Sequence, residues 1–226
     1  MIKINKTIEH ATLTQYRASI SKKNLLDETI YEDFEDKGKE ACENKKIGNL
    51  RLKLLEDQGF VCCYCMSQIS CKNSKIEHFK PQSKFRELQI KYTNLFISCN
   101  GNTQGQEHCD TKKANTELRN INLLSTIENK ITYTTSGKIE SNIHDLDNAL
   151  NKVLNLNTKI LKDNRREAYS TLIILLSKKN SSKRWSKELL QKYIRKYESK
   201  TVEEKFAPYY SMLLYFLRKK LIKIKN

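Results

Sequence analysis

Four cysteines are spaced as two pairs of possible metal ligands. Cys62 and Cys65 are separated by two residues, so one tight turn can present both thiolates to the same ion. Cys99 and Cys109 are separated by nine residues rich in Gly, Asn and Gln, which can fold back as a loop. Structural zinc takes four thiolate or imidazole ligands in a tetrahedron. We therefore predict a zinc knuckle built from these four cysteines.

Two alternative ligands remain open for this site. Cys63 could replace Cys62, and His108 could replace Cys109, since each is adjacent in the chain to the residue that it would replace. Cys62 is preferred because it keeps the two-residue spacing to Cys65.

A second set of residues has the types needed to hydrolyse a phosphodiester bond. Glu77 and His78 are adjacent, Asn94 lies further along, and Asp110 and Lys113 follow the last cysteine of the cluster. The reaction needs a nucleophilic water and a cation that stabilises charge in the transition state. His78 is the candidate general base, because imidazole titrates near neutral pH. Glu77 and Asp110 are candidate ligands for one Mg²⁺ or Mn²⁺ ion, since these ions prefer oxygen ligands.

The order of these residues resembles the HNH endonucleases, which have a ββα-metal active site. The general pattern is an acidic residue and His on a first strand, Asn-Leu before a second strand, and Cys with His, Asn or Asp and then Lys at the start of a helix. The matching segments are Glu77-His78, Asn94-Leu95 and Cys109-Asp110-x-x-Lys113. Longer segments, covering roughly residues 45–166, resemble the HNH subunit of Septu-type anti-phage systems (PtuB): Cys62-x-Tyr64-Cys65, Ile76-Glu77-His78-Phe79-Lys80-Pro81-Gln82-Ser83, Tyr92-x-Asn94-Leu95-x-x-Ser98-Cys99, His108-Cys109-Asp110-x-Lys112, and Leu154-Asn155-Leu156-Asn157 with Leu161 and Arg165.

The resemblance implies roles for the remaining residues. Asp110 takes the third HNH position, Asn94 holds the loop and orients His78, and Lys113, favoured over Lys112 by its spacing, contacts the substrate phosphate. Because neighbours in a strand point to opposite faces, Glu77 and His78 share one site only if the strand ends or bends there, or if Glu77 acts through a water.

The resemblance also implies a function and a partner. We expect a metal-dependent endonuclease that cleaves nucleic acid, with DNA favoured, in an antiviral defence complex with an ATPase subunit (PtuA-like). Two alternatives stay open: a nuclease for RNA such as tRNA with the same centre, and a non-catalytic zinc-knuckle module that only binds nucleic acid. The joint presence of Glu77, His78, Asn94 and Asp110 favours the enzyme.

The pattern of apolar residues predicts a mainly α chain with a small ββα-metal core, a zinc knuckle and a helical C-terminal extension. Few breakers interrupt it, since the chain has two prolines and six glycines. We expect a helix of about three turns that ends at Gly59, strands over residues 75–79 and 95–99, a hairpin turning at Ser136-Gly137, and helices beyond Asp145. In the C-terminal helices, apolar residues recur at helical spacing, among them Leu161, Leu172, Leu175, Leu213 and Leu217. The expected organisation is a partly acidic segment (1–44), the nuclease core (45–145) and a basic helical extension (146–226).

Charge and composition bound the setting in which the chain acts. The net charge is +16, and residues 178–226 contribute +11 of it, a candidate footprint for nucleic acid. Residues 24–43 carry a net −6. No apolar run is long enough for a signal peptide or membrane span, so we expect a cytoplasmic protein without membrane association, with Cys42, Cys63 and Cys71 as ordinary thiols.

Overall fold

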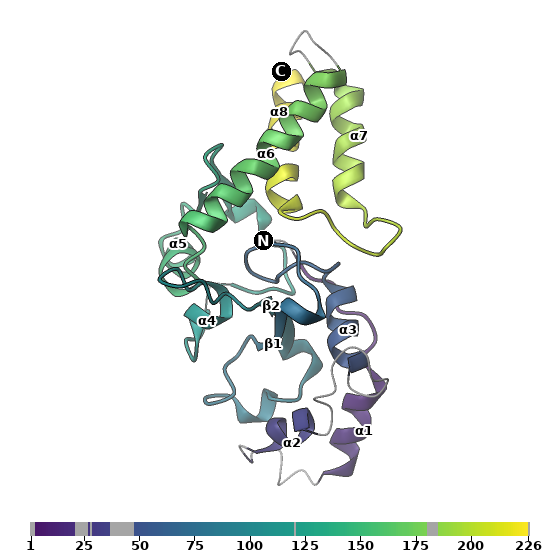
Figure 1. Cartoon of the computed structure of the whole chain (residues 1–226), viewed down its shortest axis with the longest axis vertical. Helices are drawn as coiled ribbons and strands as arrows, with labels where there is room; N and C mark the ends of the chain where they lie inside the picture. The colour runs from purple at the N-terminus through teal and green to yellow at the C-terminus, as the bar shows by residue number, and fades with distance from the viewer. Residues whose placement is uncertain are drawn as a thin grey trace.

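The computed structural model describes residues 3–20, 27, 29–36, 48–119, 121–179 and 185–225. These residues are mainly helical, with two small antiparallel sheets (Figure 1), so the mainly α prediction is confirmed. Most of the acidic stretch 24–43, including Cys42, lies outside the described residues. The helices are α1 (Ala11–Ser19), α2 (Ile30–Asp36), α3 (Gly48–Asp57), α4 (Cys109–Lys113), α5 (His144–Asn148), α6 (Lys159–Lys179), α7 (Lys187–Glu198) and α8 (Tyr210–Lys225), and the strands are β1 (Ser74–His78), β2 (Leu95–Cys99), β3 (Thr132–Tyr133) and β4 (Ile139–Glu140).

The β1–β2 pair forms the centre of the first half of the chain. The strands are antiparallel, with Glu77 opposite Phe96 and His78 opposite Leu95. All five residues of β2 are buried, because α3 and α4 both contact this strand. The strands predicted from sequence are confirmed to within one residue, and so is the β3–β4 hairpin.

The chain leaves α3 through a turn that requires glycine. Gly59 has φ +60°, and a Cβ added there would lie 2.2 Å from a ring carbon of Phe206. The carbonyl of Gly59 accepts a hydrogen bond from the backbone N–H of Phe206 at 2.9 Å, which ties the link before α8 to the start of the cysteine segment. The predicted helix stop at Gly59 is therefore confirmed, and its cause includes a distant aromatic ring.

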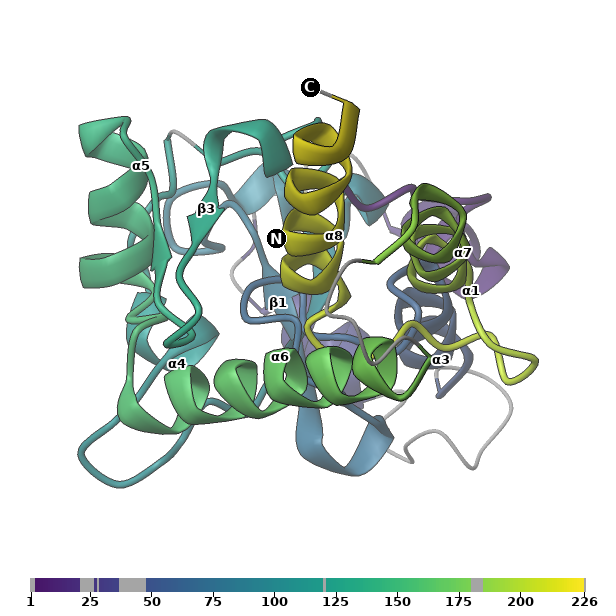
Figure 2. The same ribbon diagram turned by 90° about the horizontal axis from the view of Figure 1, so that it is seen from above.

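The C-terminal helices gather at one end of the molecule. Helix α7 lies alongside α8, while α6 passes across α8, where the rings of Tyr169 and Phe216 are 4.4 Å apart (Figures 1 and 2). Leu161, Leu172, Leu213 and Leu217 are buried, as their spacing predicts. Leu175 is only partly buried, and Leu176 takes the core position instead.

One hydrophobic core joins residues from all three predicted segments, including Leu13, Leu54 and Leu214. Ile4, near the N-terminus, belongs to this core as well. Its backbone N–H donates a hydrogen bond to Leu123 O at 2.8 Å. None of the described helices is both long and apolar enough to cross a membrane.

Candidate active site and metal centre

The four predicted cysteines form one buried cluster. Their sulfur atoms all lie within 4.8 Å of one another. Cys62 Sγ is 3.9 Å from Cys109 Sγ, and Cys65 Sγ is 3.8 Å from Cys99 Sγ. Four sulfurs about 2.3 Å from a tetrahedral zinc ion would lie about 3.8 Å apart. The cluster therefore fits a structural metal ion such as zinc.

Backbone contacts explain how the chain brings these cysteines together. The N–H of Cys63 donates to Ile97 O at 3.1 Å, which joins the first pair to β2 and so to Cys99. The loop of residues 100–108 closes on itself through a hydrogen bond from His108 N–H to Gly101 O at 3.0 Å. A Cβ on Gly101 would lie 2.1 Å from the carbonyl oxygen of His108, so this closure needs glycine. The nine-residue loop thus returns Cys109 to the first pair.

The two alternative ligands lie outside the sulfur cluster. Cys63 does not belong to it, and burial raises the pKa of its thiol. His108 Nδ1 lies 3.2 Å from Cys109 Sγ and 3.8 Å from Cys99 Sγ, beside two sulfurs rather than in place of one. The preference for Cys62 over Cys63 therefore agrees with the structure.

The prediction for Cys71 is wrong, because the structure has this residue disulfide-bonded rather than as an ordinary thiol. Spacing alone carried no signal for this bond.

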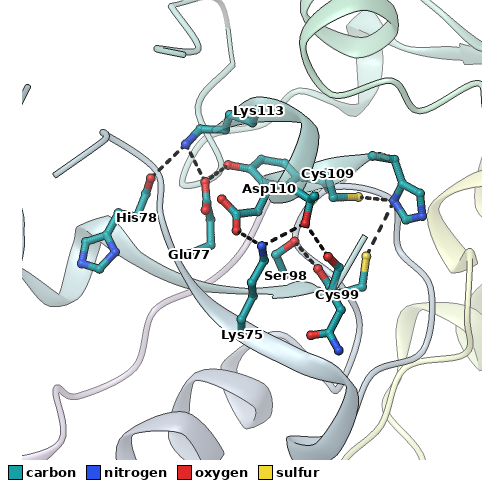
Figure 3. Close-up of polar contacts among 12 residues, drawn as sticks. Lys75, Glu77, His78, Ser98, Cys99, Cys109, Asp110 and Lys113 are labelled. Atoms are coloured by element: carbon teal, nitrogen blue, oxygen red, sulfur yellow. Dashed lines mark hydrogen bonds and ion pairs between the residues drawn. The ribbon is translucent and has the colours of Figure 1, made fainter. Parts of the chain in front are cut away.

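Glu77 is held by two buried side chains. Its carboxylate is 2 % exposed, and its Oε1 accepts a hydrogen bond from the Tyr64 hydroxyl at 2.6 Å and pairs with Lys113 Nζ at 2.7 Å (Figure 3). Burial raises the pKa of Glu77, and a hydrogen bond shared with Asp110 raises it further, while Lys113 opposes both effects. Both of these buried partners contact Oε1.

Asp110 is the second carboxylate of the site. It pairs with Lys75 Nζ at 2.6 Å, and the same ammonium donates to Thr111 Oγ1 at 3.0 Å (Figure 3). Although burial opposes it, hydrogen bonds from Glu77 and Lys75 lower the pKa of Asp110 overall. The two carboxyl groups therefore shift apart, with the pKa of Glu77 raised and that of Asp110 lowered.

His78 faces away from the Glu77 carboxylate (Figure 3). Its Nε2 lies 2.8 Å from the Gln89 carbonyl and donates to it, which leaves Nδ1 to accept from the Gln82 amide at 2.9 Å. Tyr31 packs edge-on against the ring, with centroids 4.3 Å apart. Burial lowers the pKa of His78 to about 4, so the imidazole is neutral near pH 7. Glu77 and His78 thus point to opposite faces of β1, as expected for neighbours in a strand.

One cavity of ≈ 600 Å³ nevertheless reaches both faces of the strand end. Glu77, His78, Asp110 and Lys113 all line it. Four of the five predicted catalytic residues are therefore brought to one space, although the two that are adjacent in sequence enter it from different sides.

Asn94 acts on the loop between the strands. Its Oδ1 accepts from Lys80 N–H at 2.8 Å, and its Nδ2 donates to the carbonyls of Lys80 and Leu88, each at 3.1 Å. This is the loop-holding role that was predicted. Within the described part of the chain its side chain makes no hydrogen bond to His78, so it orients the ring only through the loop that carries Gln82 and Gln89.

Lys113 lies differently from the expected phosphate contact. Its side chain is 1 % exposed, and its ammonium donates to His78 O at 3.1 Å as well as pairing with Glu77. The exposed neighbour Lys112 is the lysine of this pair that faces solvent. In the observed arrangement Lys113 positions the end of β1 and the Glu77 carboxylate.

Several residues of the site carried no assigned role from sequence. Lys75 lies two residues before Glu77 on the same face of β1, a spacing that could have identified it. Tyr64 stands inside the first cysteine pair, but nothing in its spacing shows that its hydroxyl reaches Glu77. Gln82 lies in a segment that carries the resemblance, but nothing in the sequence shows that Gln82 or Gln89 contacts His78, because these contacts depend on the path of a loop.

No family model matches the chain, and a search of the curated proteins found no match either.

Proposed function

We propose that this chain is a metal-dependent HNH endonuclease that hydrolyses phosphodiester bonds of nucleic acid, with β1, β2 and α4 as its ββα-metal core. The observation that carries the proposal is that two carboxylates, Glu77 and Asp110, and a neutral imidazole, His78, line the same cavity. A hard cation site next to a general base is the minimum that hydrolysis by an activated water requires.

Glu77 and Asp110 fit a divalent ion that prefers oxygen ligands. Mg²⁺ is commonly held by one or two carboxylates, with water and substrate phosphate completing its shell. Two carboxyl groups in one cavity carry excess negative charge that a cation would neutralise. Lys75, which is 38 % exposed at its side chain, can leave Asp110 for solvent when a cation binds. The ion would supply charge stabilisation in the transition state.

His78 is the proposed general base. Its neutral state leaves a lone pair on Nδ1, and the Gln89 carbonyl stabilises the proton on Nε2 when the ring becomes charged. The Gln82 amide occupies Nδ1 in the observed structure, so a substrate water must displace it. Lys113 and Tyr64 hold Glu77 in place throughout.

The cysteine cluster is proposed to hold zinc as a structural ion. Cys109 is both a member of the cluster and the first residue of α4, and Asp110 follows it directly. A metal bound there fixes the start of the helix that carries the second carboxylate. The zinc therefore supports the catalytic residues and takes no part in the reaction.

We propose DNA as the favoured substrate and a defence complex with an ATPase subunit as the setting. The support is the resemblance of the motifs and the positive charge of the extension, where Arg218, Lys219, Lys220 and Lys223 are exposed on α8. Phosphate contacts by such residues supply most non-specific affinity for nucleic acid.

The test is a cleavage assay on plasmid DNA, single-stranded DNA and total RNA, with Mg²⁺ or Mn²⁺ and with a candidate ATPase partner present or absent. His78→Ala should lower the rate by about 10²- to 10⁴-fold. His144→Ala is the matched control, because that side chain is 86 % exposed and outside the cavity. Omitting Mg²⁺ is preferable to adding a chelator, which would also remove zinc.

The three substrates separate the competing functions. Cleavage of RNA alone would move the assignment to an RNA nuclease with the same centre. Binding without cleavage, unchanged by His78→Ala and by the partner, would instead support a non-catalytic module.

A further inference from the structure

Arg165 on α6 is a buried cation that pairs with no carboxylate among the residues that the structure describes. Arg165 is 2 % exposed. Its Nε donates a hydrogen bond to Gly137 O, and its Nη2 donates to Leu156 O and to Asn157 Oδ1. Its Nη1 is buried and has no acceptor among the residues that the structure describes. A buried charge is strongly unfavourable unless another charge compensates it, and neutral carbonyls do so only in part. A nearby anion would therefore stabilise the guanidinium.

The turn at residues 154–157 connects Arg165 to the cysteine cluster. The carbonyl of Leu154 accepts from Cys109 N–H at 2.9 Å, and the carbonyl of Leu156, two residues later, accepts from Arg165. Asn155 Nδ2 also donates to Glu107 O at 2.9 Å, next to the same cysteine segment. One short turn thus contacts both the metal-ligand loop and the guanidinium.

Among the residues that the structure describes, the 154–157 turn connects Arg165 to one group that can become an anion, the cysteine cluster. Burial lowers the pKa of Arg165, and the charges of Tyr133, Cys65, Tyr209 and Cys109 raise it. Burial raises the pKa of both tyrosines, so their hydroxyls are neutral at pH 7. The cysteine sulfurs beyond this turn supply negative charge when a metal ion binds them as thiolates.

We propose that Arg165 is the counter-charge of a zinc–tetrathiolate centre formed by Cys62, Cys65, Cys99 and Cys109. Four thiolates exceed the charge of a divalent ion by two, and a buried guanidinium cancels half of this excess. Backbone donors assist, as in the contact of Cys99 N–H with Cys62 Sγ at 3.3 Å. Zinc binding is thereby coupled to the position of α6, the helix that carries Arg165, and hence to the helical extension. This inference does not depend on nuclease activity.

The test compares zinc retention in the full-length zinc-loaded protein and its variants. Arg165→Met removes the charge with little change of shape. Arg165→Lys keeps the charge but replaces the planar guanidinium and its several N–H donors with an ammonium. Arg166→Met is the matched control, since the Arg166 side chain is 59 % exposed on the same helix. The measurement is the rate of zinc transfer to a chromophoric chelator.

We expect Arg165→Met to release zinc about 10- to 100-fold faster, as is typical when an outer-shell partner of a metal site is lost. Arg165→Lys should stay close to the unaltered protein, and so should Arg166→Met. Equal release by Arg165→Met and Arg166→Met would overturn the proposal. Equally fast release by the Lys and Met variants would overturn it too, because it would assign the role to the donor geometry rather than to the charge.

A second readout separates charge compensation from general packing. Arg165→Met should lower the thermal midpoint of the zinc-loaded protein but not that of the zinc-free protein, in which the guanidinium has no anion to pair with. An equal loss in both forms would make Arg165 a packing residue only. If the zinc-free chain shows no transition, the chelator rates decide the question.

Discussion

Replacing Lys113 with methionine tests whether the buried ion pair with Glu77 stabilises the end of β1. The two side chains are 1 % and 2 % exposed, and Nζ lies 2.7 Å from Oε1. Methionine keeps most of the apolar volume of lysine but removes its charge and its hydrogen bond to His78 O. Because the substitution leaves a buried carboxylate unpaired, the free energy of unfolding should fall by about 3–5 kcal/mol at pH 8.

The loss should depend on pH with a defined sign. Burial already raises the pKa of Glu77, and removing the ammonium raises it more. An acid with a higher pKa in the folded than in the unfolded protein binds more protons when folded, so folding loses stability as the pH rises above the unfolded value. Above the folded pKa of Glu77 in the unaltered protein, the deficit of Lys113→Met should grow with pH, by up to about 1.4 kcal/mol per pH unit while Glu77 remains protonated in the folded variant.

The assay is denaturant unfolding of the zinc-loaded protein, followed by circular dichroism at pH 5 and pH 8. Lys112→Met is the matched control, since that side chain is exposed and its loss should cost less than about 0.5 kcal/mol. The double variant Glu77→Gln with Lys113→Met should recover part of the stability at pH 8, because no buried charge remains. Equal stabilities of the Lys113→Met and Lys112→Met variants at both pH values would refute the reasoning, and a deficit independent of pH would show that Glu77 is not the group left unpaired.

Two further outcomes are expected from the same geometry. Asn94→Ala removes three side-chain hydrogen bonds to Lys80 and Leu88. The free energy of unfolding should therefore fall by about 2 kcal/mol in the same denaturant assay. A fall of less than about 0.5 kcal/mol would contradict the loop-holding role. Burial lowers the pKa of His78 to about 4, so the ring should stay neutral from pH 5 to pH 8. The metal-dependent cleavage rate should therefore show no drop near the ordinary histidine pKa of about 6.5. A titration midpoint there would mean that the ring is solvated in the working enzyme.

Short-range patterns account for what was predictable in the fold. The strands β1 and β2, the hairpin at Ser136-Gly137 and the helix ending before Gly59 are encoded by alternation, turn residues and a helix breaker within a few positions. The pair Cys62 and Cys65 is likewise set by one turn. Such features are visible in sequence because the residues that determine them are close along the chain.

The candidate site was predictable in its members but not in its arrangement. The residue types at Glu77, His78 and Asp110 indicate their chemistry, and all three line one cavity. Their catalytic roles stay predictions until cleavage is measured. The burial of Lys113 had no sequence signal, because an exposed and a buried lysine look the same in a helix of five residues.

By itself, the sequence determined which residues can bind metal, the local elements that carry them, and the positive charge of the C-terminal helices. Only the tertiary structure decided that the sulfurs of Cys99 and Cys109 reach the first pair, that Tyr64 and Lys113 hold Glu77, and that Arg165 is buried against the turn that contacts the cysteine segment. The physical reason is that these contacts join residues far apart in the chain. Their energies depend on burial, and burial is a property of the whole packed molecule rather than of any short segment.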